Sequence, residues 1–245
     1  MSTTWCRFEA GGKTSFGRID GDAVIAIDGA PWSAHKESST RHALSSVKLL
    51  IPTVPSTFYC VGINYRDHII QAAKRRGVEP QFPQRPDIGY RANNALCAHD
   101  DPIVKPKDAG DIFQYEGELV AVIGKQGKKI PADKALDHVF GWTIGNDVSE
   151  RTWQRGDRTL WRGKNADSFK PMGPWIVTGL DYRSMTTVVR LNGQEVDRFA
   201  TANMIHDVET YIAEVSKYCT LYPGDVCEVD ITGIGTLRNK VVLED

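Results

Sequence analysis

Short apolar runs, separated by polar and glycine-rich stretches, recur along the chain. Runs at residues 119–123, 139–144, 175–178, 186–192 and 226–231 have the length and composition of β-strands. The run at 119–123 is apolar at every position, so both faces of that strand are expected to be buried.

Two segments predict helices. In "RDHIIQAAKRRG" we expect Asp67 as N-cap and Gly77 as C-cap. In "DVETYIAEVSKYCT" the apolar residues recur at i, i+3, i+4 and i+7, with Asp207 as the expected cap. The proline-rich "VEPQFPQRPDIGYRANN" predicts loop or edge structure. Many strands with few helices favour a β-rich α+β fold.

The first residues read as a small unit of their own. "TSFGRID" and "AVIAIDG" are strand-like and are separated by a Gly-Asp pair, which predicts a hairpin. The polar segment 33–46 shows no period, and a new apolar block begins at Lys48. We therefore predict a small β-rich unit at residues 1–47 and a larger catalytic domain at 48–245.

Composition narrows the functional classes. The net charge is −1 over 245 residues and no charge block is present, which argues against nucleic-acid and membrane-surface partners. No apolar run approaches the roughly 20 residues that span a bilayer. Five scattered cysteines without a C-x-x-C pair, and no signal-peptide pattern, predict a cytoplasmic protein with reduced thiols.

Candidate chemistry begins in "QYEGELVAVIGK". On a strand, Glu116 and Glu118 point the same way and repel each other, so they mark either a solvated strand end or a site for a hard divalent cation. Asp147 in "GWTIGNDVSERTWQ" is a third candidate ligand. If "DVSERTWQ" is helical, Asp147, Arg151 and Gln154 share one face; alternatively Asp147 is simply an N-cap.

A lysine follows in "LWRGKNADSFKPMGPW". Lys164 stands among Trp161, Phe169 and Trp175 in the sequence. Its stem could lie along these rings with the ammonium group in water. Alternatively the ammonium group is partly desolvated and directed at a developing oxyanion.

Six stretches together resemble the fumarylacetoacetate hydrolase superfamily, from about Pro52 to the C-terminus: "VGINYRDH", "ALCAHDDPIVKP", "YEGELVAVIGK", "GWTIGNDVSERTWQ", "GKNADSFKPMGPWIVT" and "DITGIGTLRNKV". The resemblance implies a mixed β-roll fold and a homodimer. It also implies a divalent metal, Mg²⁺ or Mn²⁺, for which Ca²⁺ could substitute in crystals.

The resemblance also implies roles for individual residues. Glu116, Glu118 and Asp147 would hold the metal. Arg91, Arg151 and Gln154 would contact a 2-oxo acid or 1,3-dicarbonyl substrate, and Lys164 would act in catalysis. Such substrates fit, because adjacent carbonyl oxygens chelate a metal and an enolate forms beside it.

Two features depart from the family pattern. Hydrolytic members activate water with a histidine and a glutamate three residues on; His68 matches the histidine, but position 71 is Gln71, which cannot hold a proton. The family's Thr-Gly-rich loop after "TLYPGD" is also absent. Either one wall of the site is missing, or the sequence omits a mobile segment; we favour omission, and an intact mass of 27.2 kDa would exclude it.

These observations leave three functional hypotheses. The first is a metal-dependent hydrolase that cleaves a C–C bond in acylpyruvate-type substrates. The second is a 2-oxo-acid decarboxylase, on an oxaloacetate-like substrate, or an enol–keto tautomerase; Gln71 favours it because neither reaction needs an attacking water. The third is a non-catalytic metal- or ligand-binding relative, against which the clustered charges argue.

Overall fold

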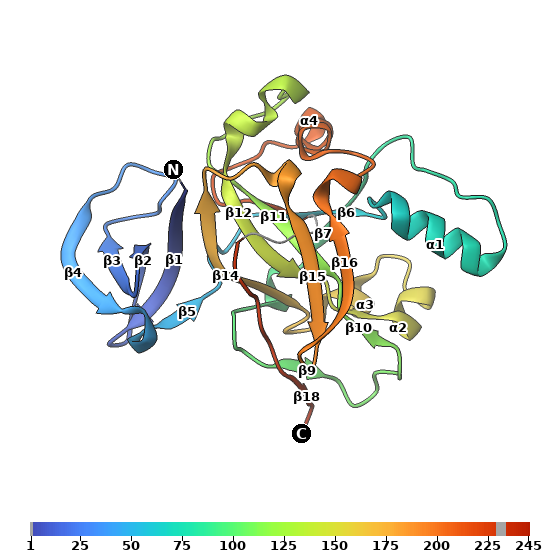
Figure 1. Ribbon diagram of the computed structural model, residues 1–245, viewed down its shortest axis with the longest axis horizontal. Helices are drawn as coiled ribbons and strands as arrows, with labels where there is room; N and C mark the ends of the chain where they lie inside the picture. The colour runs from blue at the N-terminus through green and yellow to red at the C-terminus, as the bar shows by residue number, and fades with distance from the viewer. Residues whose placement is uncertain (1, 229–233) are drawn as a thin grey trace.

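A long mixed β-sheet forms the centre of the molecule (Figure 1). The computed structural model describes residues 2–228 and 234–245. Within these residues the sheet runs in the order β4 (Glu37–Ala43), β3 (Ala23–Ile27), β2 (Lys13–Asp20), β1 (Thr3–Ala10), β14 (Lys170–Thr178), β12 (Val139–Asn146), β11 (Gly117–Ile123), β17 (Val226–Glu228), β6 (Phe58–Gly62) and β7 (Asp87–Arg91). Two short strands join it from the side: β5 (Lys48–Leu50) pairs with β1, and β8 (Leu96–Cys97) with β14.

Smaller elements complete the fold. Three two-stranded sheets pair β10 (Phe113–Gln114) with β13 (Ser149–Glu150), β15 (Thr186–Leu191) with β16 (Gln194–Ala200), and β9 (Ile103–Lys105) with β18 (Val241–Leu243). The α-helices of the described residues are α1 (Arg66–Arg76), α2 (Arg151–Gly156), α3 (Trp161–Asn165) and α4 (Val208–Tyr218). The predicted β-rich α+β class is confirmed.

Most predicted strands form where the apolar runs lie. The runs at 119–123, 139–144 and 175–178 fall within β11, β12 and β14, and the run at 186–192 corresponds to β15. Residues 226–228 form β17, while residues 229–231 of that run and the next two residues lie outside the described part of the chain. That the expected Thr-Gly-rich loop is omitted rather than missing stays a prediction.

The pattern missed β1 and β4. In β4 six of the seven side chains are exposed, because this edge strand pairs through its backbone with β3 alone. Such a strand needs no apolar period.

The predicted hairpin is present: β2 and β3 pair antiparallel, and Gly21 in their turn takes a left-handed φ of 57°. Strand β1 also pairs with β14, so strands from both sides of the predicted boundary at residue 47 belong to one sheet. The division into two domains stays a prediction.

The central strand β11 is buried on both faces, as its composition predicts. Leu119, Ala121 and Ile123 pack in one cluster with Tyr211, Ile212 and Val215 of α4. Val120 and Val122 belong to a second cluster on the other side, which Trp5 and Trp32 of the N-terminal region cover. Apolar burial on two sides therefore fixes this strand in place.

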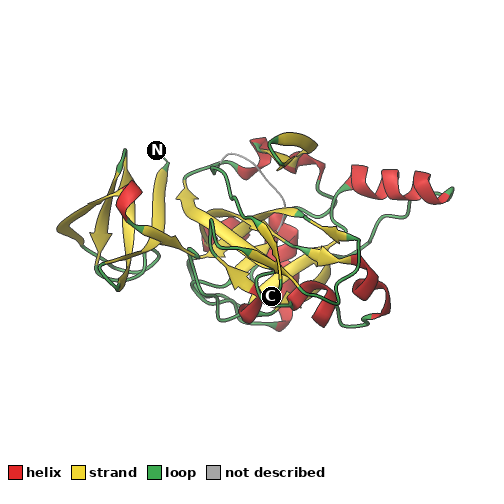
Figure 2. Cartoon of the chain, turned by 90° about the horizontal axis from the view of Figure 1, so that it is seen from below, coloured by secondary structure: helices red, strands yellow, loops and turns green. Residues whose placement is uncertain are grey.

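The two predicted helices form, with one correction at a cap. The Asp207 side chain accepts a hydrogen bond from the Thr210 amide at 2.8 Å, and Gly77 ends α1 at a left-handed φ of 67°. Asp67, however, is not the N-cap of α1: Tyr65 holds that position, and Asp67 lies in the first turn, where its carboxylate accepts from Asn203. Helix α1 projects from the body of the molecule (Figures 1 and 2).

Truncating the buried face of β11 tests this packing. Leu119 is 0% exposed, so Leu119→Ala should lower the free energy of unfolding by about 2–5 kcal/mol, because it removes buried methyl groups and leaves a cavity. Leu191→Ala is the matched control: Leu191 is 52% exposed, and its substitution should cost within about 0.5 kcal/mol. Urea denaturation at fixed protein concentration measures both, and equal losses would contradict the assigned core.

Candidate metal centre

The register of two neighbouring strands brings three carboxylates together. Strands β11 and β12 are antiparallel, with Gly117 opposite Asn146 and Glu118 opposite Gly145. The start of β11 therefore lies beside the end of β12, and Glu116, Glu118 and Asp147 each place a carboxylate oxygen within 4.8 Å of the others.

Backbone contacts hold this corner rigidly. The Asp147 amide donates to the Glu116 carbonyl oxygen at 2.8 Å, and the Glu116 amide donates to Asn146 Oδ1 at 3.0 Å. The Ser149 hydroxyl donates to the Asp147 carbonyl oxygen at 2.9 Å. The carboxylates thus project from a fixed backbone, which favours defined geometry at the site.

Asp147 is surrounded by cations. Arg91 donates from Nε to Oδ1 at 3.0 Å and from Nη2 to Oδ2 at 2.7 Å. Lys170 Nζ lies 2.6 Å from Oδ1, and Lys164 Nζ lies 2.5 Å from Oδ2. The Asp147 side chain is only 5% exposed, so these contacts form with little competition from water.

The pKa of the Asp147 carboxyl reflects this environment. Burial opposes its ionisation, but the charges of Lys170, Lys164 and Arg91 outweigh burial and hold the pKa well below its usual range. Burial likewise disfavours the charged form of Lys164, but Asp147 and Glu116 together raise its pKa. Asp147 and Lys164 are therefore both ionised at neutral pH.

Glu116 connects this group to helix α2. Its Oε2 accepts from Lys164 Nζ, and its Oε1 accepts from Arg151 Nη2 at 2.6 Å. Arg151 also donates to Gln154 Oε1 at 2.9 Å and to Gln114 Oε1 at 2.8 Å. The predicted substrate residues Arg151 and Gln154 therefore lie next to the carboxylates, although their contact with substrate stays a prediction.

The local structure after Asp147 differs from both sequence hypotheses. Asp147 neither begins the helix nor shares its face, because β13 intervenes and α2 starts at Arg151. The N-cap is Glu150, whose carboxylate accepts from the amides of Thr152 and Trp153. Arg151 and Gln154 still meet, since they are three residues apart within α2.

Arg91 lies deeper than its expected role suggests. We predicted a substrate-facing residue, but the structure places its guanidinium against Asp147, with the side chain 6% exposed and Nη1 donating to the Tyr90 carbonyl oxygen at 3.0 Å. Lys164 is also buried, which favours the desolvated alternative over an ammonium group in water.

His68 and Gln71 are the predicted residues that the structure does not bring to the carboxylates. Both are exposed on α1. In the described part of the chain, no hydrogen bond or ion pair joins either side chain to Glu116 or Asp147. Their catalytic roles stay predictions.

Lys170 is a residue of this site that the sequence analysis missed. The Lys170 side chain is 1% exposed, and its ammonium group also donates to the carbonyl oxygens of Val148 at 3.0 Å and Phe169 at 2.9 Å. The signal was its place at the head of the apolar run "KPMGPWIVT". A buried lysine requires an anionic partner, and the structure shows that this partner is Asp147, 23 residues earlier in the chain.

The residues present fit a hard divalent cation. Mg²⁺ and Mn²⁺ prefer carboxylate oxygens, and three such groups converge on a small region of space. Glu116 and Glu118 are half-buried while Asp147 is buried, so the cluster is reached from one side. Glu116, Glu118 and Asp147 would be the ligands.

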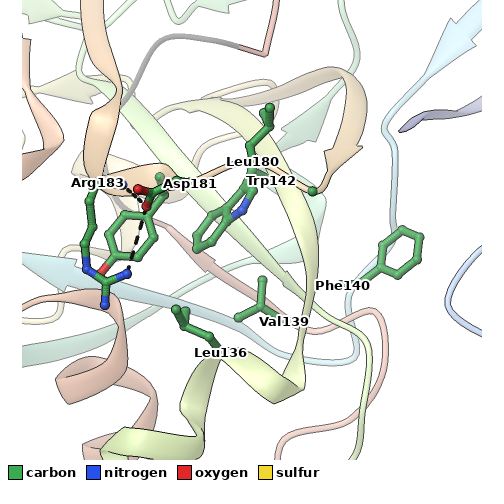
Figure 3. A pocket seen from close by; sticks show the side chains of 9 residues that line it. Leu136, Val139, Phe140, Trp142, Leu180, Asp181 and Arg183 are labelled. Atoms are coloured by element: carbon green, nitrogen blue, oxygen red, sulfur yellow. Dashed lines mark hydrogen bonds and ion pairs between the residues drawn. The ribbon is translucent and has the colours of Figure 1, made fainter. Parts of the chain in front are cut away.

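A separate hollow lies at the other end of β12. It has a volume of about 160 Å³ and is lined by Leu136, Val139, Phe140, Trp142 and residues 179–183 (Figure 3). None of the predicted site residues lines it.

Over the described residues, no helix is long and apolar enough to cross a membrane.

Comparison with known proteins identifies relatives over nearly the whole chain. The family model "Fumarylacetoacetate (FAA) hydrolase C-terminal" matches residues 57–227, and the model "Rv2993c-like, N-terminal" matches residues 4–52. Protein Rv2993c of Mycobacterium tuberculosis is 37% identical, covering 92% of this chain and 97% of that protein.

Two relatives carry names that state a reaction. The mitochondrial oxaloacetate tautomerase fahd2 of Xenopus laevis is 35% identical, covering 83% of this chain and 65% of that protein. The crystal structure of 5-carboxymethyl-2-hydroxymuconate delta-isomerase from Mycobacterium smegmatis superposes with a TM-score of 0.87 at 34% identity, covering 98% of this chain and 100% of that one. These relatives are enzymes that act on small organic acids.

Removing the Lys170 charge tests the buried pairing. Lys170→Met should lower the free energy of unfolding by about 3–5 kcal/mol, because it removes one of the three cations around the buried Asp147 carboxylate and takes a donor from the carbonyl oxygens of Val148 and Phe169. Lys217→Met is the control: Lys217 is exposed and pairs with Glu214, which keeps Arg85 as a second partner, so the substitution should cost at most about 1 kcal/mol. Urea denaturation compares them, and a Lys170→Met variant as stable as the control would contradict the pairing.

Proposed function

The chain belongs to the fumarylacetoacetate hydrolase family, and from that premise we propose that it is a divalent-metal-dependent enzyme that interconverts the enol and keto forms of a 2-oxo dicarboxylic acid. The observation that carries the proposal is the convergence of three carboxylates with the buried Lys164 ammonium group. Mg²⁺ or Mn²⁺ is the proposed ion. When bound, it would supply Lewis-acid polarisation of the substrate carbonyl.

The side chains of this site suit proton transfer at a carbonyl. Tautomerisation is an isomerisation: the proton that leaves the carbon beside the carbonyl group would pass to water, and water would return one to the carbonyl oxygen, so no second reactant is consumed. Lys164 would donate to that oxygen as negative charge develops on it. Arg151, whose guanidinium is partly exposed, would orient a substrate carboxylate with Gln154.

The charge of the cluster favours a dianionic substrate. Among the described residues, Arg91, Arg151, Lys164 and Lys170 form ion pairs with Glu116 and Asp147. Counting Glu118, four cations face three anions, so the group has an excess positive charge before a divalent cation adds two more. A substrate with two carboxylates would compensate this excess.

Hydrolysis of acylpyruvates, which the sequence favoured first, is the second candidate. His68 at the start of α1 supports it, since a histidine could activate water if α1 closed over the carboxylates. Gln71 argues for the tautomerase, as do the exposed positions of His68 and Gln71 and the names of the isomerase and tautomerase relatives. Decarboxylation of the same substrates also needs no attacking water.

A substrate panel separates the candidates. The purified protein should accelerate enol–keto exchange of oxaloacetate, followed by ultraviolet absorbance, with Mg²⁺ or Mn²⁺, and the acceleration should be lost with EDTA. Acylpyruvates should be cleaved at least about tenfold less efficiently in kcat/KM, which is about 1.4 kcal/mol of transition-state stabilisation. Pyruvate release from oxaloacetate would reveal decarboxylation instead.

The Gln71→Glu variant provides the discriminating control. If hydrolysis is not the native reaction, restoring a carboxylate beside His68 should raise acylpyruvate cleavage while oxaloacetate exchange stays unchanged. Efficient acylpyruvate cleavage by the parent protein, with no acceleration of enol–keto exchange, would contradict the proposal and favour hydrolysis. Metal binding without turnover of any of these acids would favour the non-catalytic hypothesis.

A further inference from the structure

We propose that the Lys164 ammonium group holds the place of the divalent cation in the metal-free protein, and that metal binding requires this group to leave its two carboxylates. The inference rests on the metal dependence proposed above. It assigns Lys164 a second role, as an internal competitor for the ligands, beside its role toward the substrate.

The position of Lys164 Nζ is the first support. The ammonium group lies 2.5 Å from Asp147 Oδ2 and also contacts Glu116 Oε2, so it bridges two of the three proposed ligands. A single positive charge between two carboxylates reduces their repulsion in the way that a metal would. The same two oxygens cannot accept a second cation at bonding distance while this group stays between them.

The acceptor capacity of Asp147 is the second support. An ionised carboxylate offers about four acceptor sites. Here Oδ1 accepts from Arg91 and lies 2.6 Å from the Lys170 ammonium nitrogen, and Oδ2 accepts from Arg91 and Lys164. Each of these sites is occupied, so Asp147 becomes a metal ligand only when one of its donors withdraws.

Lys164 is the donor that is free to withdraw. Lys170 is anchored by the carbonyl oxygens of Val148 and Phe169. Arg91 binds both oxygens of Asp147 and is held by the Tyr90 carbonyl oxygen. The side-chain contacts of Lys164, by contrast, are with Glu116 and Asp147 themselves, and its flexible stem arises from the one-turn helix α3.

The arrangement has a consequence for the metal-free state. When Lys164 withdraws, Arg91 and Lys170 still pair with Asp147, so the buried carboxylate keeps two cations. When the metal is absent, Lys164 keeps Glu116 and Asp147 from repelling each other. The site thus stays assembled in both states.

Mn²⁺ titration of the metal-free protein, without substrate, tests the competition. Lys164→Met keeps most of the stem and removes the competing charge, and we expect its Kd for Mn²⁺ by isothermal titration calorimetry to fall at least about tenfold. Arg151→Met is the charge-matched control, since Arg151 pairs with Glu116 alone among the three carboxylates and should change the Kd less. A Lys164→Met variant that binds no more tightly than the parent, or no more tightly than Arg151→Met, would overturn the inference.

Lysine acylation with mass spectrometry gives an independent measurement on the parent protein. Lys164 is 6% exposed and should react slowly without metal, then several-fold faster at saturating Mn²⁺, while exposed Lys217 should react equally in both. Unchanged Lys164 reactivity would overturn the displacement.

The Glu118→Gln variant separates failure of this inference from failure of the proposed function, with Glu9→Gln at an exposed position of β1 as control. If Glu118→Gln binds Mn²⁺ like the parent, the metal centre itself is wrong. If Glu118→Gln no longer binds Mn²⁺ but Lys164→Met binds Mn²⁺ no more tightly than the parent, the metal centre is supported and only the role of Lys164 as a competitor is wrong.

Discussion

The mutual repulsion of one buried and two half-buried carboxylates is the constraint on which this site depends. Two like charges about 4 Å apart repel by about 4 kcal/mol at an effective dielectric constant of 20, and burial adds the cost of lost hydration. Glu116, Glu118 and Asp147 converge within 4.8 Å, so the fold must supply positive charge at the same place. In the described residues that charge comes from lysine and arginine side chains, and the divalent ion of the proposed function would add to it.

The architecture delivers these charges from separate parts of the chain. Strand β11 is held between two apolar clusters, so its first residues have little freedom to move apart from β12. Strand β14 contributes Lys170 and the edge strand β7 contributes Arg91, while the short helix α3 contributes Lys164. Two of these cations, Lys170 and Arg91, thus stand on strands of the sheet, while Lys164 stands on a helix of a single turn.

Much of this could be predicted from the sequence, and the reasons for the failures are physical. The apolar run at 119–123 and the spacing of Glu116 and Glu118 indicated a buried strand with two carboxylates at its mouth, because both signals are local. Strand β4 escaped because an edge strand with exposed side chains needs no apolar period. Lys170 and the pairing of Arg91 with Asp147 were not predicted, because the order of strands in the sheet decides which distant charges meet. No local sequence pattern encodes that order.

The location of the divalent ion tests the central claim most directly. A crystal of the protein grown with Mn²⁺, measured at the manganese absorption edge, would show the ion by anomalous scattering. The account predicts one strong peak bounded by oxygens of Glu116, Glu118 and Asp147, with the Lys164 ammonium group displaced from Asp147. A peak elsewhere, or none beside these carboxylates while Lys164 still bridges them, would contradict it.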